Sequence, residues 1–133
     1  MKYPPIQNYI AGNFVTPSTH TAMQVISPLD GNLLSTVPMS GKNDLDHAVE
    51  SARNAFPSWS NTPIKERVQV FFRYKTLLEK NLKMLAELCS EENGKTYSES
   101  VAEIEKCIEL TEFATSLPQL ISGELLEVSK GVE

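Results

Sequence analysis

The hydrophobic periodicity of the chain changes near Lys42, and no other feature constrains the fold as strongly. Before Lys42, short apolar runs at residues 9–15, 23–26 and 33–37 are interrupted by turn residues, which is typical of β-hairpins. After Lys42, apolar residues recur at the spacing of amphipathic helices. The sequence shows no internal repeat and no low-complexity linker. We therefore predict one α+β unit over residues 1–133, in which N-terminal β-hairpin strands precede about four α-helices.

Glycine and proline indicate where the strands turn. Gly12 and Asn13 divide the first apolar run, and such a pair commonly joins two short antiparallel strands. The stretch 28–32 contains Pro28, Asp30 and Gly31, and Gly31 can adopt the positive φ that a tight turn requires. These residues predict two hairpins. Such hairpins occur in proteins of every function, so they do not indicate what the chain does.

Start and stop signals divide the rest of the chain into helices. Asn43 and Asn81 are predicted N-caps, Pro57 is expected to end the first helix, and Gly94 is expected to close another by a left-handed residue. The predicted helices cover residues 44–56, 63–80, 82–93 and 98 to about 118. Beyond them, residues 124–128 have the composition of a strand.

Charge and composition exclude several classes of partner. The formal net charge is -5, and no Lys/Arg cluster forms a basic stripe, so we expect no nucleic-acid partner and no membrane partner. No apolar run is long enough to span a bilayer. The first residues resemble neither a secretory signal nor an organellar presequence, so the expected location is cytoplasmic.

The residues alone do not define a catalytic centre. The glycines are too scattered for a phosphate-binding loop. Cys89 and Cys107 fall in helical apolar patterns and are interpreted as small buried residues, and His20 as a solvated loop residue. The acidic residues between 99 and 112 are interpreted as a solvated helix surface. On this evidence the function stays open.

Several short stretches, in order along the chain, resemble the start of the aldehyde dehydrogenase superfamily. They are a hairpin at 9–15, a Pro-x-Asp-Gly turn within 26–34, a helix at 46–59 that ends near Trp59, and matches within 66–96. Each is weak singly, but together they cover nearly the whole chain. The resemblance implies that residues 1–133 form the N-terminal part of the aldehyde dehydrogenase α/β fold.

Further stretches resemble one branch of that superfamily, the acylating methylmalonate- and malonate-semialdehyde dehydrogenases. They are residues 55–59, 72–74, 108–114, 117–120 and 123–124. The resemblance implies a parent enzyme that uses NAD and coenzyme A. A succinate-semialdehyde or betaine-aldehyde type remains an alternative, and so does a stand-alone truncated assembly or interaction module.

The resemblance also implies that the catalytic machinery lies downstream of this segment. Neither Cys89 nor Cys107 matches the family's catalytic cysteine, so we expect residues 1–133 alone to be inactive and to bind no cofactor. The expected partners are the remainder of the same polypeptide and further copies in a homo-oligomer. Helix faces that the remainder would cover should make the isolated segment self-associate.

Two site predictions rest on the resemblance. Some superfamily members bind a structural monovalent cation, and the matching positions here are the carbonyls of Val25 and Ile26 and the carboxylate of Glu92. In the semialdehyde branch an arginine grips the substrate carboxylate, and Lys106 stands in its place. Lysine keeps the positive charge but loses the bidentate fork. The alternatives are that Glu92 and Lys106 are ordinary solvated surface residues.

Overall fold

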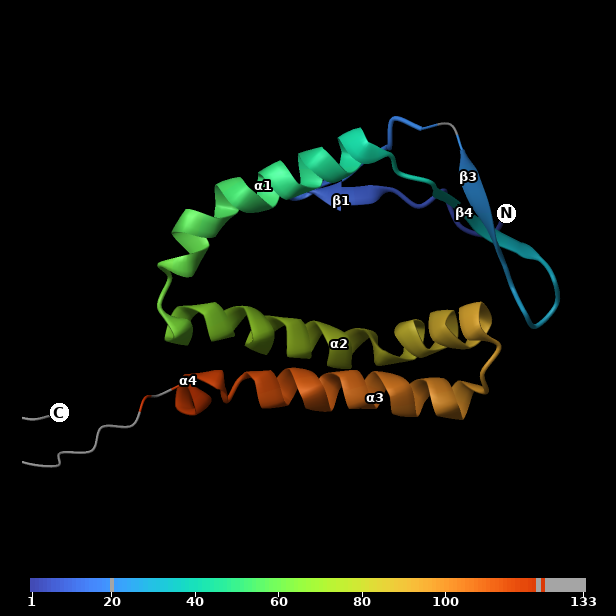
Figure 1. Ribbon diagram of the computed structural model, residues 1–133. Helices are drawn as coiled ribbons and strands as arrows, with labels where there is room; N and C mark the ends of the chain where they lie inside the picture. The colour runs from blue at the N-terminus through green and yellow to red at the C-terminus, as the bar shows by residue number, and fades with distance from the viewer. Residues whose placement is uncertain (20, 122, 124–133) are drawn as a thin grey trace, which may run out of the picture.

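The fold is described by a computed structural model that covers residues 1–19, 21–121 and 123. Its elements are β1 (Asn8–Ile10), β2 (Asn13–Val15), β3 (Ala22–Ile26), β4 (Leu33–Pro38), α1 (Lys42–Ser60), α2 (Ile64–Asn93), α3 (Tyr97–Ala114) and α4 (Leu117–Leu120). Strand hairpins precede helices, as the sequence predicted (Figure 1). The strand expected at 124–128 and the predicted loop residue His20 lie outside the described residues.

The two hairpins form separate two-stranded antiparallel sheets. Ala11 and Gly12 join β1 to β2 with φ values of 52° and 80°, and Ile10 pairs with Asn13. The turn therefore lies one residue earlier than predicted, because two consecutive left-handed residues form the tight turn that matches strand twist. Gly31, with φ of 74°, lies in the turn between β3 and β4 as predicted.

The first helix differs from its predicted limits at both ends. Gly41 rather than Asn43 is the N-cap, and Asp44 accepts a hydrogen bond from the Gly41 N–H at 2.9 Å. The helix also continues through Pro57 to Ser60. Pro57 removes one backbone donor, but the Asn61 amide donates to the Pro57 carbonyl at 2.8 Å and stabilises the last turn. Proline here is tolerated inside the helix instead of ending it.

The second and third predicted helices form one continuous helix, α2, of 30 residues. Asn81 is not a cap, because its side-chain amide donates to the Leu77 carbonyl at 2.7 Å and so bonds to the preceding helical turn. Gly94 ends α2 in the left-handed conformation, as predicted. The next helix, α3, begins after Thr96 rather than at Ser98, with a reciprocal capping box between Thr96 and Glu99.

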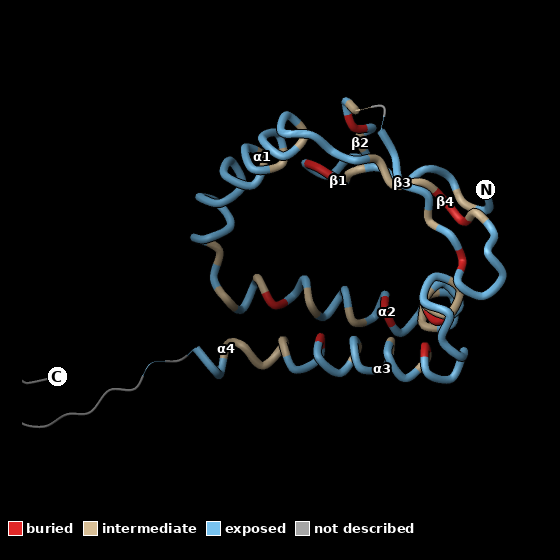
Figure 2. Tube along the Cα trace, turned by 45° about the vertical axis from the view of Figure 1, so that its right-hand side comes forward, coloured by how far each residue is buried: buried red, intermediate tan, exposed pale blue. Residues whose placement is uncertain are grey.

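The main packing contact is between α2 and α3, which run antiparallel and side by side (Figure 1). Val68, Leu78 and Ala86 of α2 are buried, and α3 buries Ser100 and Thr111 (Figure 2). Ala86 and Ser100 are both 0% exposed, and such small side chains allow two helices to approach closely. None of the helices in the described part of the chain is both long and apolar enough to cross a membrane.

Helix α1 leaves its apolar side chains uncovered. It extends away from the α2–α3 pair and contains no buried residue (Figures 1 and 2). Leu45, Val49, Phe56 and Trp59 are all exposed, with Phe56 at 67%. A monomer that exposes so much contiguous apolar surface tends to associate.

We expect the isolated 133-residue chain to self-associate through such surfaces, because burial of apolar area is favourable at roughly 25 cal/mol per Å². Multi-angle light scattering over a hundredfold concentration range measures this directly. Substitution of Phe56 and Trp59 by Ser should shift the distribution toward monomer. A monodisperse monomer at every concentration would contradict the prediction.

A close backbone contact joins the end of α2 to the β3–β4 turn. Gly94 has a φ of 71°, and a Cβ added to it would lie 3.0 Å from Pro28 Cγ. Gly31 has nearly the same φ, of 74°, but an added Cβ would meet nothing within 4 Å. A comparison of substitutions at the two glycines therefore distinguishes the cost of a side chain at positive φ from the cost of contact with Pro28.

Gly94→Ala should destabilise the chain more than Gly31→Ala. Both substitutions place a side chain at positive φ, which costs about 1–2 kcal/mol, and only Gly94→Ala also pushes against Pro28. The free energies of unfolding, measured in urea, test this order. Equal losses in the two variants would show that the contact with Pro28 contributes nothing.

Candidate functional site

A groove lies where the N-terminal segment and the β3–β4 hairpin meet the end of α2; we call it the α2 groove. Its volume is about 260 Å³. The residues that line it are Tyr3, Pro4, Ile6, Val25, Leu34, Ser35, Leu88, Glu91 and Glu92. The wall is mostly apolar, with two adjacent carboxylates on the α2 side.

The structure brings part of the predicted cation site to this groove. Val25 and Glu92 both line it, and Ile26 adjoins Val25 at an irregularity in the β3–β4 pairing. Such bulges interrupt the ladder and leave backbone groups unpaired. Within the described residues, the Glu92 carboxylate has neither a hydrogen bond nor an ion pair. Carbonyl and carboxylate oxygens suit a hard cation, although three ligands give only part of its coordination shell.

Glu91, which also lines the α2 groove, makes contacts that the sequence did not reveal. Its carboxylate accepts hydrogen bonds from Lys2 Nζ at 2.6 Å and from Tyr3 Oη at 2.7 Å. These bonds, led by that from Lys2, lower the pKa of Glu91 below its ordinary value. The bond to Glu91 likewise raises the pKa of Lys2. Lys2 and Glu91 are 89 positions apart, so no local sequence pattern links them.

Lys106 lies on the exposed surface of α3. Its Nζ donates to both carboxylate oxygens of Glu109, each at 2.8 Å. The pair is three residues apart on one helical face, so the sequence spacing could have predicted it. The ammonium group is therefore placed to hold a carboxylate, and in this structure that carboxylate is its helical neighbour.

The two cysteines are less buried than the sequence indicated. Cys107 is exposed, and Cys89 is half-buried. The Cys89 Sγ lies 3.7 Å from a Glu103 carboxylate oxygen and 3.8 Å from the Asn93 amide nitrogen. Neither thiol is therefore a core residue, although Cys89 reaches Glu103 of α3.

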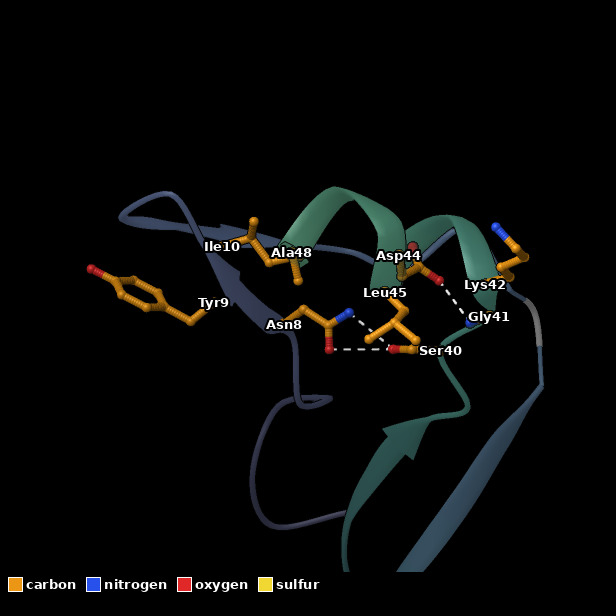
Figure 3. A pocket seen from close by; sticks show the side chains of 9 residues that line it. All are labelled: Asn8, Tyr9, Ile10, Ser40, Gly41, Lys42, Asp44, Leu45 and Ala48. Atoms are coloured by element: carbon orange, nitrogen blue, oxygen red, sulfur yellow. Dashed lines mark hydrogen bonds between the residues drawn. The ribbon is translucent and has the colours of Figure 1, made fainter. Parts of the chain in front are cut away.

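A second hollow lies between β1 and the start of α1, and polar residues that line it form hydrogen bonds with one another (Figure 3). Asn8 donates to Ser40 Oγ at 2.9 Å. Asp44 caps Gly41 and also accepts from the Ser18 N–H at 3.2 Å, and these backbone bonds lower the pKa of Asp44. The polar groups here fix the helix end to the strands. Across the described residues, no three His, Cys, Asp or Glu side chains gather to hold a metal ion.

The sequence of the chain matches the aldehyde dehydrogenase family model over residues 14–133. It is 40% identical over 121 residues to malonate-semialdehyde dehydrogenase 1 of Geobacillus kaustophilus, covering 91% of this chain and 25% of that protein. It is 39% identical to malonate-semialdehyde dehydrogenase 2 of Bacillus mycoides, covering 96% of this chain and 27% of that protein. The chain belongs to the aldehyde dehydrogenase family, and it spans about a quarter of the length of these curated relatives.

Solved structures of the family share the fold described above. A Sinorhizobium meliloti protein, described as a methylmalonate-semialdehyde dehydrogenase and solved with NAD, is 33% identical with a TM-score of 0.88. The match covers 96% of this chain and 26% of that one. The methylmalonate-semialdehyde dehydrogenase of Oceanimonas doudoroffii is 31% identical with a TM-score of 0.86, over 92% and 25% of the two chains. The predicted family and N-terminal fold are both confirmed.

Proposed function

We propose that this chain is the N-terminal segment of an NAD-dependent, coenzyme A-acylating methylmalonate- or malonate-semialdehyde dehydrogenase. The observation that carries the proposal is the 40% identity to a malonate-semialdehyde dehydrogenase over 91% of the chain. The TM-score of 0.88 with a structure described as a methylmalonate-semialdehyde dehydrogenase supports the same branch. The remainder of the polypeptide is the partner that this proposal requires.

We propose further that residues 1–133 are inactive without that remainder. Acyl transfer from an aldehyde needs an activated nucleophile and donors for the oxyanion. Cys89 contacts a carboxylate and an amide rather than an imidazole base. The described glycines are scattered along the chain and form no glycine-rich loop for a nucleotide phosphate. These observations support the proposal, and we assign the binding of NAD and coenzyme A to the parent enzyme.

An assay of the complete parent protein tests the branch. With malonate or methylmalonate semialdehyde, NAD and coenzyme A, we expect NADH and an acyl-coenzyme A product, and NADH formation should depend on coenzyme A. The 133-residue chain serves as the matched control and should form no NADH. Turnover of succinate semialdehyde or betaine aldehyde without thioester formation would place the parent in another branch. Turnover by the chain alone would refute its inactivity.

Lys106 supplies a variant for the same assay. We propose that it contacts the substrate carboxylate, in competition with Glu109, which occupies its ammonium group in this structure. Lys106→Gln should raise KM about tenfold, because a charge-assisted hydrogen bond is lost, and Lys106→Arg should restore binding. Lys42→Gln is the control, since Lys42 is also exposed and paired within its own helix, with Asp46. Equal effects of the two glutamine variants would identify Lys106 as an ordinary surface lysine.

We also propose that a monovalent cation binds the carbonyls of Val25 and Ile26 and the carboxylate of Glu92. The position of Val25 and Glu92 in one groove and the irregular pairing at Ile26 support this proposal. Glu91 is already neutralised by Lys2, so Glu92 is the uncompensated carboxylate of the groove, which suits a single positive charge.

Thermal unfolding tests the cation proposal. At constant ionic strength, replacement of tetramethylammonium by sodium or potassium should raise Tm by about 2–4 °C, because a ligand of the folded state stabilises it. Glu92→Gln should abolish the increase. Glu105→Gln, which removes the same charge from the exposed face of α3, should retain it. An unchanged cation response in the Glu92 variant would exclude this site.

A further inference from the structure

The side chain of Arg67 has a polar atom that is shielded from solvent and lacks a partner. Arg67 belongs to the first turn of α2, where its backbone N–H donates to the Pro63 carbonyl at 3.0 Å. The side chain is half-buried, and its Nε has no hydrogen-bond partner among the described residues. A shielded donor costs free energy when it stays unpaired, and folded proteins therefore pair nearly all such groups. An acceptor for Arg67 is therefore expected.

Arg67 differs from the other arginines and from the other shielded polar atom. Arg53 and Arg73 are exposed, and Arg53 Nη1 lies 3.6 Å from Glu50 of its own helix. In the part of the chain that the structure describes, Ser100 Oγ is also buried without a partner. The Ser100 side chain is 0% exposed, so no added group can reach it. Arg67 is only half-buried, and a ligand can approach it.

The chemistry of the guanidinium favours a carboxylate. The side chain of arginine is always charged and has donors but no acceptor, and a half-buried cation is stable when an anion pairs with it. The first turn of a helix is the positive end of the helix dipole, which also favours an anion. Nε and one Nη form a planar edge with two donors, and this edge matches the two oxygens of a carboxylate. A carboxylate therefore suits Arg67 better than a neutral acceptor.

The helix itself offers Arg67 no such carboxylate. Residues three and four positions away share a helical face, and those around Arg67 are all apolar. They are Pro63, Ile64, Val70 and Phe71. Glu66 is adjacent in sequence, but successive side chains of a helix point about 100° apart. None of the ion pairs among the described residues includes Arg67. The partner has to come from another part of the polypeptide.

In the proposed parent enzyme, most of the polypeptide follows residue 133. The chain spans 25% of the length of the Geobacillus kaustophilus relative. The last described helix, α4, contacts α2 and lies beside its start (Figure 1). The described part of the chain thus ends near the turn that carries Arg67, and a segment that continues from there has this side chain close at hand.

We propose that Arg67 forms an ion pair with a carboxylate of the polypeptide that follows residue 133, and so anchors the start of α2 to the rest of the parent enzyme. The inference rests on the proposed function in one respect, that residues 1–133 are a segment of a longer protein. It does not depend on the substrate or on coenzyme A. Its tests use no substrate, so a parent protein that fails the semialdehyde assay can still show this ion pair.

Zero-length cross-linking of the complete parent protein tests the chemistry and the source of the partner. In Arg67→Lys, a water-soluble carbodiimide should join the amine at position 67 to an Asp or Glu beyond residue 133, as an amide that mass spectrometry of the digest identifies. Arg53→Lys is the matched control, because Glu50 lies 3.6 Å from the Arg53 guanidinium and should be cross-linked in the same reaction. A cross-link from position 67 only to residues 1–133, or none while the control reacts, overturns the proposal.

Thermal unfolding of the parent and of the 133-residue chain gives an independent measurement. Arg67→Met should lower the Tm of the parent by about 3 °C or more, because it leaves the partner carboxylate shielded and unpaired. In the 133-residue chain it should not lower Tm, since it removes a shielded donor without a partner among the described residues. Arg53→Met removes an exposed pair and should have the same small effect in both proteins. An equal decrease for Arg67→Met in chain and parent would place the partner within residues 1–133 and refute the proposal.

Discussion

The carboxylate of Glu91 accepts hydrogen bonds from Lys2 and Tyr3, and through them the strands are fixed to the end of α2. Helix α1 contacts β1, whereas α2 packs mainly on α3. The strands and the end of α2 meet at a junction that includes the hydrogen bonds of Glu91 and the close approach of Pro28 to Gly94. The α2 groove lies at this junction, with residues of both parts in its wall.

Local signals predicted the elements of the fold better than their limits. Gly31 and Gly94 adopt the positive φ that their turns required, because glycine has no Cβ to oppose it. Asn81 and Pro57 were interpreted as helix boundaries, but both lie inside helices. In each case a side-chain amide donates to a backbone carbonyl of the same helix, at Leu77 or Pro57. Sequence alone does not show which of two hydrogen bonds such an amide will make.

For the candidate cation site, the sequence offered a family resemblance and no local signal. The resemblance indicated Val25 and Glu92, and both line one groove. Glu91 could not be predicted, because its partners lie 88 and 89 positions away and neither end of the interaction has a distinctive sequence context. The pairing of Lys106 with Glu109 follows from helical spacing alone, and it shows that the ammonium group has a carboxylate partner even without substrate.

Glu91 and Glu92 show how adjacent residues of one helix take different roles. Successive side chains on an α-helix point about 100° apart, so two neighbours face different surroundings. Glu91 faces the N-terminal segment, where Lys2 and Tyr3 occupy both of its oxygens. Glu92 has no such partner among the described residues, and its charge remains available to the groove. A cation at Glu92 is therefore compatible with the ion pair at Glu91, since Lys2 neutralises the carboxylate that would otherwise add a second negative charge to the site.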